Sequence, residues 1–105
     1  MGDIKASRFE IKTILEKILG SNHVYYSLRE NEKMEYPAIK YEQMDTDIKY
    51  ADNEPYLMKM RYTTTVIGRV PNDDVVQKLV KELKCKPTRH YTYDGLFHDV
   101  LTFYY

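Results

Sequence analysis

The sequence lacks the features that mark several large classes of protein. A single cysteine, Cys85, excludes an intramolecular disulfide and suits a reducing compartment. The apolar runs are only a few residues long, so we expect no segment to span a membrane. Sixteen basic and sixteen acidic residues leave no net charge, whereas bulk binding of nucleic acid draws on an excess of positive charge. Low net charge also weakens repulsion between copies, which favours association.

Tryptophan is absent, and eleven tyrosines supply most of the aromatic side chains. Tyrosine combines a large apolar ring with a hydroxyl group, so it suits both half-buried sheet faces and protein interfaces. The composition leaves these two uses open. The 105 residues have room for one domain, residues 1–105, with a core that needs no disulfide or metal staple.

The stretch 56–70 dominates the pattern of the chain. It is rich in β-branched and aromatic residues and has no internal proline. Apolar and polar side chains alternate with a period of two, which predicts a strand with one buried and one solvent-exposed face. At roughly 40 Å or more it would be long enough for other strands to align on it. The two faces are Met58, Met60, Tyr62, Thr64 and Val66 on one side, and Lys59, Arg61, Thr63 and Thr65 on the other.

Two helices and four further strands are expected around this stretch. A capping box at 7–10 and a C-terminal stop at Gly20 predict a helix over residues 7–19. The residues before it are expected to form a loose arm or an extra helical turn. A second helix follows Pro71, with Asn72 or Asp73 as its cap and an uninterrupted apolar stripe that includes Val80. Strands are predicted at 23–27, 36–43, 88–93 and 96–105, with a hairpin loop at 28–35, a loop at 44–55 and a hairpin turn at 93–95.

This order, α-β-β-β-α-β-β, predicts an α+β domain. The economical arrangement is a mostly antiparallel sheet of about five strands with both helices packed on one face.

Two groups of opposite charge are the candidate interaction residues. The acidic group lies in the predicted loop 44–55, which lacks the glycine and the spacing of a calcium-binding loop. It is either a solvated loop or a loop that binds a partner. The basic group surrounds the end of the second helix, where it complements the helix dipole and could also contact DNA or an acidic surface. If the groups lie on different sides of the domain, they suit head-to-tail contacts that close into rings. The acidic group consists of Asp45, Asp47, Asp52 and Glu54 together with Tyr50. The basic group consists of Lys81, Lys84, Lys86 and Arg89.

The sequence offers one metal-binding and one catalytic alternative. His90 and His98 flank the predicted turn and could face each other with Asp94 or Asp99, but a metal site needs three or four converging ligands and the sequence marks no others. Cys85 as a nucleophile would need a base and an electropositive setting, and a free cysteine after a helix is more often inert. No cofactor, metal or catalytic residue is therefore predicted, and the chain is not expected to be an enzyme.

Several short motifs gain meaning from their order and spacing. Across nearly the full chain they resemble the tail-terminator, or tail-completion (minor head-to-tail joining), proteins of tailed bacteriophages, with the nearest likeness in prophages and phage-like particles of Gram-positive bacteria. Most are ordinary strand and turn patterns when taken singly. The motifs are Val24–Tyr26, Tyr36–Tyr41, Tyr50–Asn53, Arg61–Thr63, Pro71–Asp74, and Arg89–Val100 with its Tyr-Asp-Gly-Leu-Phe-His segment.

The resemblance implies a structural role in the tail of a virion or phage-like particle made in the bacterial cytoplasm. Family members form a hexameric ring on the head-proximal end of the tail tube, end tube polymerisation and offer a docking face. The implied partners are copies of the chain, the tail tube protein and, beyond these, the sheath protein and head-tail connector, without membrane or specific nucleic acid. By location alone, the segment 45–54 matches a loop that family members project toward neighbours or the tube.

Three other functions remain open at this point. The chain could be another head-tail or tail-tube component, a nucleic-acid-binding module that stacks bases on sheet tyrosines, or a small enzyme.

Overall fold

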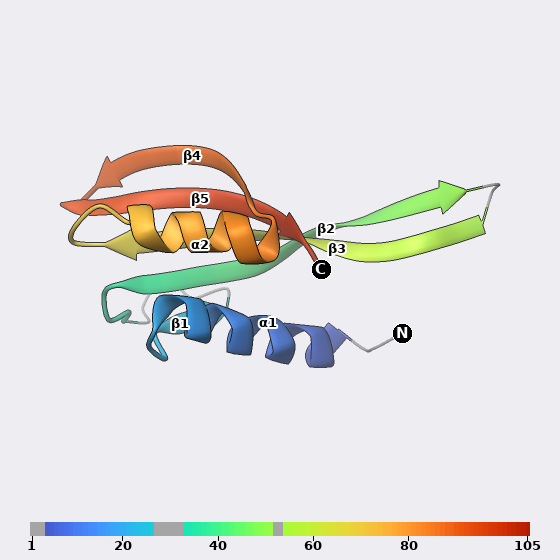
Figure 1. Cartoon of the computed structure of the whole chain (residues 1–105), viewed down its shortest axis with the longest axis horizontal. Coiled ribbons are helices and arrows are strands. Elements are labelled where there is room, and N and C mark those ends of the chain that lie inside the picture. Colours follow the sequence, from blue (N-terminus) through green and yellow to red (C-terminus); the bar gives the residue numbers. More distant parts are fainter. Residues whose placement is uncertain (1–3, 27–32, 52–53) are drawn as a thin grey trace.

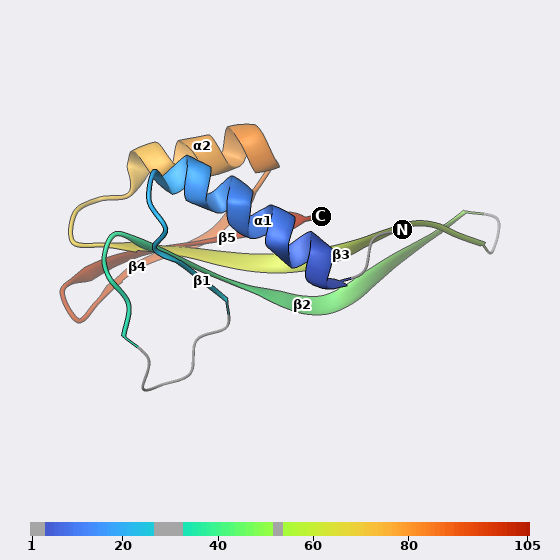
Figure 2. The same ribbon diagram turned by 90° about the horizontal axis from the view of Figure 1, so that it is seen from below.

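The computed structural model describes residues 4–26, 33–51 and 54–105. Its elements follow the predicted order α-β-β-β-α-β-β (Figure 1). Five strands form one mixed, mostly antiparallel sheet in the order β1-β2-β3-β5-β4. Both helices cover the same face of this sheet, as Figure 2 shows, which confirms the predicted α+β architecture. The elements are α1 (Ile4–Leu19), β1 (Val24–Tyr26), β2 (Ala38–Ala51), β3 (Glu54–Gly68), α2 (Asp73–Leu83), β4 (Lys86–Tyr93) and β5 (Leu96–Tyr104).

Helix α1 begins earlier than its capping box predicts. It starts at Ile4 rather than after Ser7, because the residues before Ser7 tolerate the helix and allow an extra turn. Its end is as predicted: Gly20 has a φ of 82°, and its N–H donates to the carbonyl of Glu16 at 2.8 Å. Within α1, Ile11 and Leu15 are fully buried and fix this helix against the sheet.

The first two strands pair in parallel, so the predicted hairpin between them is wrong. Val24 pairs with Ile39 and Tyr26 with Tyr41. This register places the two tyrosine rings edge to face with centroids 5.1 Å apart. A parallel pair needs a crossover rather than a tight turn. Of the predicted loop 28–35, residues 28–32 lie outside the described part of the chain.

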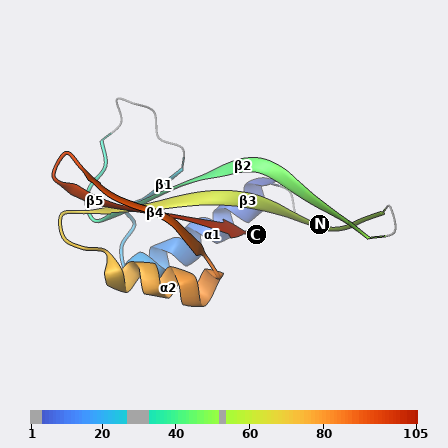
Figure 3. The same cartoon turned by 90° about the horizontal axis from the view of Figure 1, so that it is seen from above.

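The predicted loop at 44–55 is also wrong, because this segment is mostly strand. Strand β2 continues to Ala51 and β3 begins at Glu54, with cross-strand pairs from Thr46 and Met60 out to these two residues. Charged residues alternate here with strand-forming threonine, isoleucine and tyrosine, so the period of two persists. The hairpin extends well beyond the rest of the fold (Figures 1 and 3), and the long axis of the molecule is 49 Å against 24 and 23 Å for the others.

The core lies between the helices and the central strands. On the predicted inner face of β3, Tyr62, Thr64 and Val66 are buried and Met60 is half-buried, while the side chain of Met58 lies outside the described residues. Tyr62 stacks on Phe103 of β5 with ring centroids 5.3 Å apart. Leu79 from α2 is fully buried above the sheet, but Val80 is 39% exposed, so the apolar stripe of α2 is interrupted. Burial of this one-sided set of apolar side chains is the main force that joins the two layers.

The last hairpin follows its sequence signal closely. Asp94 and Gly95 both have positive φ, 55° and 72°, which a tight two-residue turn requires. Strand β4 begins two residues earlier than predicted, and its register shifts between Pro87 and Arg89. Proline lacks a backbone donor, so an edge strand with a bulge is where a sheet tolerates it.

The end of the sequence docks onto the sheet, as its apolar residues predict. The backbone of Tyr105 exchanges two hydrogen bonds with that of Met60, at 3.0 and 3.1 Å. Within the described residues, neither helix has the length and apolar character to cross a bilayer.

Candidate interaction surfaces

Asn72 connects three elements below the start of α2. It is only 6% exposed, and it stands at the predicted cap position, but its side chain does not cap the helix. Its Nδ2 instead donates to the carbonyl oxygens of Val66 and Phe97, at 3.2 and 3.1 Å, and to Asp99 Oδ2 at 3.2 Å. A Cβ on Gly68 would lie 2.5 Å from Asn72 Oδ1, so the glycine makes room for this arrangement.

Asp99 extends this network to the edge strand. Its Oδ1 lies 2.6 Å from His90 Nδ1, with the side chains of His90 and Asp99 62% and 16% exposed. Because Asn72 holds Oδ2, both oxygens of the carboxylate have partners. The network therefore ties β4 and the start of α2 to β5.

The two histidines of the hairpin do not face each other, so the metal-binding alternative is wrong for this pair. His90 is paired with Asp99, and the next pair is Tyr91 with His98. Since neighbouring residues of a strand point to opposite faces, His98 lies on the face away from the helices. There it stacks on Tyr91, with ring centroids 4.7 Å apart and planes 11° from parallel.

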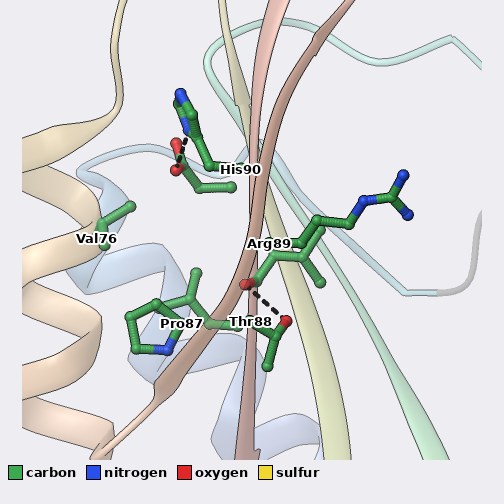
Figure 4. A pocket seen from close by; sticks show the side chains of 8 residues that line it. Val76, Pro87, Thr88, Arg89 and His90 are labelled. Carbon is green, nitrogen blue, oxygen red and sulfur yellow. Dashed lines mark hydrogen bonds and ion pairs between the residues drawn. The ribbon is translucent and has the colours of Figure 1, made fainter.

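A shallow pocket of about 270 Å³ lies at the outer edge of the sheet, and we call it the edge pocket. It surrounds the bulge of β4, where Thr88 Oγ1 donates to the carbonyl of Val100 at 3.0 Å. Figure 4 shows Pro87 and His90 on the α2 side of β4 and Arg89 on the other side. The lining residues are Val76, Pro87, Thr88, Arg89, His90, Asp99, Val100 and Leu101.

The predicted acidic residues belong to the extension of the β2–β3 hairpin, which we call the acidic arm (residues 44–60). Asp45, Asp47 and Tyr50 lie in β2, Glu54 is the first residue of β3, and Asp52 falls outside the described residues. β1 pairs only with 39–41 and β5 only with 61–68. In the described part of the chain the arm is thus a two-stranded ribbon apart from the link at Met60. Such a ribbon is marginally stable alone in water.

The predicted basic residues are spread along the α2–β4 junction. Lys81 is in the last turn of α2, Lys84 is its left-handed C-cap, and Lys86 opens β4. Arg89 lies further along β4, and its guanidinium carbon is 4.8 Å from the centroid of the Tyr91 ring. Lysines occupy the junction, while Arg89 lines the edge pocket with its side chain directed to the other side of β4.

Cys85 is buried between these lysines and is only 3% exposed. Burial raises the pKa of its thiol to about 12. A nucleophilic cysteine needs an accessible thiolate, so the surroundings of Cys85 give no support to this alternative.

The sequence was compared with known proteins. No protein-family model matches it, and no match was found among curated proteins.

Sequence reasoning missed the edge pocket and the role of Asn72. Pro87 inside a predicted strand region was a usable signal, because proline marks an edge or a bulge. Asn72 gave no such signal, since an asparagine before a helix indicates a cap and two of its three partners, Phe97 and Asp99, lie far along the chain.

Proposed function

We propose that this chain is a structural phage-tail assembly protein, similar to tail terminators, that forms a ring on the head-proximal end of a tail tube. The acidic arm carries the proposal. It lies where the family resemblance implies a segment directed toward neighbouring subunits or the tube, and it extends beyond the two-layer body (Figure 3). A segment of this kind gains stability when a partner covers it.

Opposite charges on separate parts of the domain support assembly of copies into a ring. The acidic arm and the lysines of the α2–β4 junction are unlike surfaces, so a contact between them is heterologous and closes into a ring when the rotation permits. The repeated contacts add up through avidity. The proposed interface residues are Asp45, Asp47, Tyr50, Asp52, Glu54, Lys81, Lys84, Lys86 and Arg89.

The exposed edge of the sheet fits a protein that ends polymerisation. A tube terminator must attach to the last ring of the tube without offering another edge for growth. Strand β4 begins with a lysine, a proline and a bulge, which are common devices against edge-to-edge strand pairing. The proposed role is structural, in a virion tail or phage-like particle, with the tail tube protein as partner and the sheath protein or head-tail connector beyond it.

Native mass spectrometry and negative-stain microscopy test this function. We expect a six-membered ring, and we expect the ring at one end of tubes grown from a tail tube protein of the same phage. The double variant Lys81→Glu and Lys84→Glu should weaken the ring. The same charge change at Lys12 and Lys17, which are exposed on α1, is the matched control. A chain that stays monomeric at high concentration and binds no tube ends would refute the proposal.

One observation favours a second candidate, a module for single-stranded nucleic acid. On the sheet face away from the helices, Arg89, Tyr91 and His98 form a continuous stack, and Tyr93 beside them is 70% exposed. Stacked aromatic and arginine planes are a common platform for bases. Salt-sensitive binding of a labelled oligonucleotide by a monomer would favour this function over the ring, and the zero net charge weighs against it.

A further inference from the structure

The sheet face away from the helices has a flat area of short side chains at its centre. Both helices lie on the opposite face (Figure 2). On the face away from them, Thr65 of β3 pairs with Val100 of β5, and Thr63 pairs with Thr102. All four side chains are half-buried. Because paired residues of neighbouring strands point to the same side of a sheet, they form one continuous surface. We call it the threonine bed (Thr63, Thr65, Val100 and Thr102).

Four cationic side chains surround the threonine bed. Two lie on β4, one on β2 and one on β3, each paired with a residue of the bed or next to one on the same face. Among the described residues, none of the four forms an ion pair with a carboxylate. The carboxylate that these rows contribute is Glu42, which pairs with Thr63. The four cations are Lys40, Arg61, Lys86 and Arg89.

The charge of this face differs from the charge of the whole chain. Sixteen basic and sixteen acidic residues cancel over the sequence, but four cations and one carboxylate surround the threonine bed. A polyanion responds to the local potential of the surface that it contacts, and not only to the net charge. The zero net charge therefore does not exclude a polyanion from this face.

Planar side chains lie at one end of the threonine bed. The Arg89 guanidinium lies over the Tyr91 ring, and Tyr91 stacks on His98. Tyr93, two residues further along β4, meets His98 edge to face with ring centroids 6.5 Å apart, and its ring is exposed. Aromatic side chains of this kind accept any base, because every base has a π-face. Tyr93 thus offers an open stacking surface beside the bed.

We propose that the threonine bed and the planar side chains beside it form a binding track for single-stranded nucleic acid. Phosphates lie over the bed, where they meet the surrounding cations and the hydroxyl groups of Thr65 and Thr102, and a base stacks on Tyr93. Lysine, arginine and threonine side chains are common phosphate contacts, and such contacts carry no sequence information. An acidic peptide would use the cations but not the exposed ring, so the planar groups favour nucleic acid.

This inference deepens the second candidate function, on which it rests, by naming the path of the strand. It does not depend on the ring. From His98 to Tyr104 the face spans about 20 Å at about 3.3 Å per residue. A track of this length accepts a few nucleotides, toward the short end of the range of about 4–16 nucleotides known for small binding domains.

Fluorescence anisotropy with a labelled oligothymidylate of about twelve nucleotides, within that range, tests the track. Arg61→Gln and Lys40→Gln remove cations that the ring proposal does not use. Each should reduce the slope of log affinity against log salt concentration by about 0.7, the value for one phosphate contact on a single strand. Arg61→Lys keeps the charge and should keep the slope. The matched control is Lys78→Gln, at an exposed position of α2 on the other face of the sheet.

A substitution without a change of charge tests the stacking surface. Tyr93→Leu should weaken binding by about fivefold or more, the lower limit for the loss of one stacked base. The salt slope should stay the same, because no phosphate contact is removed. Urea denaturation of each variant should give the native midpoint, since all substituted side chains lie at the surface of the sheet. Unchanged affinity of Tyr93→Leu would overturn the stacking surface.

The remaining outcomes separate the track from the candidate function. No binding of the oligothymidylate at low salt would refute the function and the track together. Binding with a native slope in both Arg61→Gln and Lys40→Gln, or with a slope reduced by Lys78→Gln instead, would overturn the track alone. Equally tight binding of polyglutamate would make the face a general anion surface and overturn its assignment to nucleic acid. Native mass spectrometry of the same variants reports the ring separately.

Discussion

The interaction between Gly68 and Asn72 gives the sharpest prediction about the fold. Asn72→Ala removes a buried amide whose nitrogen bonds two carbonyls and the Asp99 carboxylate. With two hydrogens to share, and about 1 kcal/mol for a neutral hydrogen bond and about 1.5–3 kcal/mol for one to a charged group, we expect a loss of about 2–4 kcal/mol. For a domain of this size that lowers the melting temperature by about 9–18 °C.

Gly68→Ala should be destabilising in the native sequence for a different reason. Its new Cβ would lie 2.5 Å from Asn72 Oδ1 and 3.3 Å from the carbonyl of Val70. Relief of the closer contact requires movement of an amide that three acceptors hold in place, and overpacking of this kind costs about 1–3 kcal/mol.

The double variant distinguishes this explanation from a general intolerance of residue 68. Without the Asn72 amide only the contact with Val70 remains, and alanine restricts the unfolded chain by about 0.4–1 kcal/mol more than glycine. Gly68→Ala should then be nearly neutral in the Asn72→Ala background. The assay is urea denaturation of all four proteins, with exposed Gln77→Ala of α2 as a control that should change stability little. If Gly68→Ala lowered the free energy of unfolding equally in the native and the Asn72→Ala proteins, the explanation would be refuted.

Three further predictions concern the core, the thiol and the docked end of the sequence. Leu79→Ala should lower the free energy of unfolding, measured by urea denaturation, by about 2–5 kcal/mol because Leu79 is fully buried. Val80→Ala, at its exposed neighbour, should lower it clearly less. Burial raises the pKa of Cys85 from 9.0 to about 12, so its stabilising contribution is complete below pH 9 and is lost as the pH rises toward 12. Cys85→Ala should flatten this decline of stability, and a thiol reagent at pH 8 should label the native protein only after unfolding. The hydrogen bond from the Tyr105 hydroxyl to Glu10, at 2.5 Å, raises the pKa of Tyr105, with smaller effects of burial and charge. Glu10→Gln should lower that pKa in an NMR titration of labelled tyrosine, and an unchanged value would contradict the assignment.

Local patterns were sufficient for the element order and for several boundaries. The alternation along β3 identified Tyr62, Thr64 and Val66 as its buried side, because a period of two survives in any sheet that is covered on one face. Gly20 and Gly95 fixed their turns through positive φ, a requirement of the backbone alone. The same local reasoning misread the segment 44–55, because charged residues there suggested a loop although strand-forming residues alternate with them.

The candidate site was only partly accessible in this way. Sequence reasoning named the residues of opposite charge, but it did not predict that the acidic ones belong to an arm or that Arg89 lines a pocket. The first fact depends on β2 and β3 extending beyond β1 and β5, and the second on the bulge of β4 at the edge of the sheet.

The sequence by itself determined the order of the helices and strands and which face of β3 is buried between Tyr62 and Val66, since these follow from side-chain periodicity and backbone preference. Only the tertiary structure decided the parallel pairing of β1 with β2, the acidic arm and the network of Asn72, Asp99 and His90. The physical reason is distance along the chain: Asn72 and Asp99 are separated by 27 positions, and no local pattern records that their side chains meet.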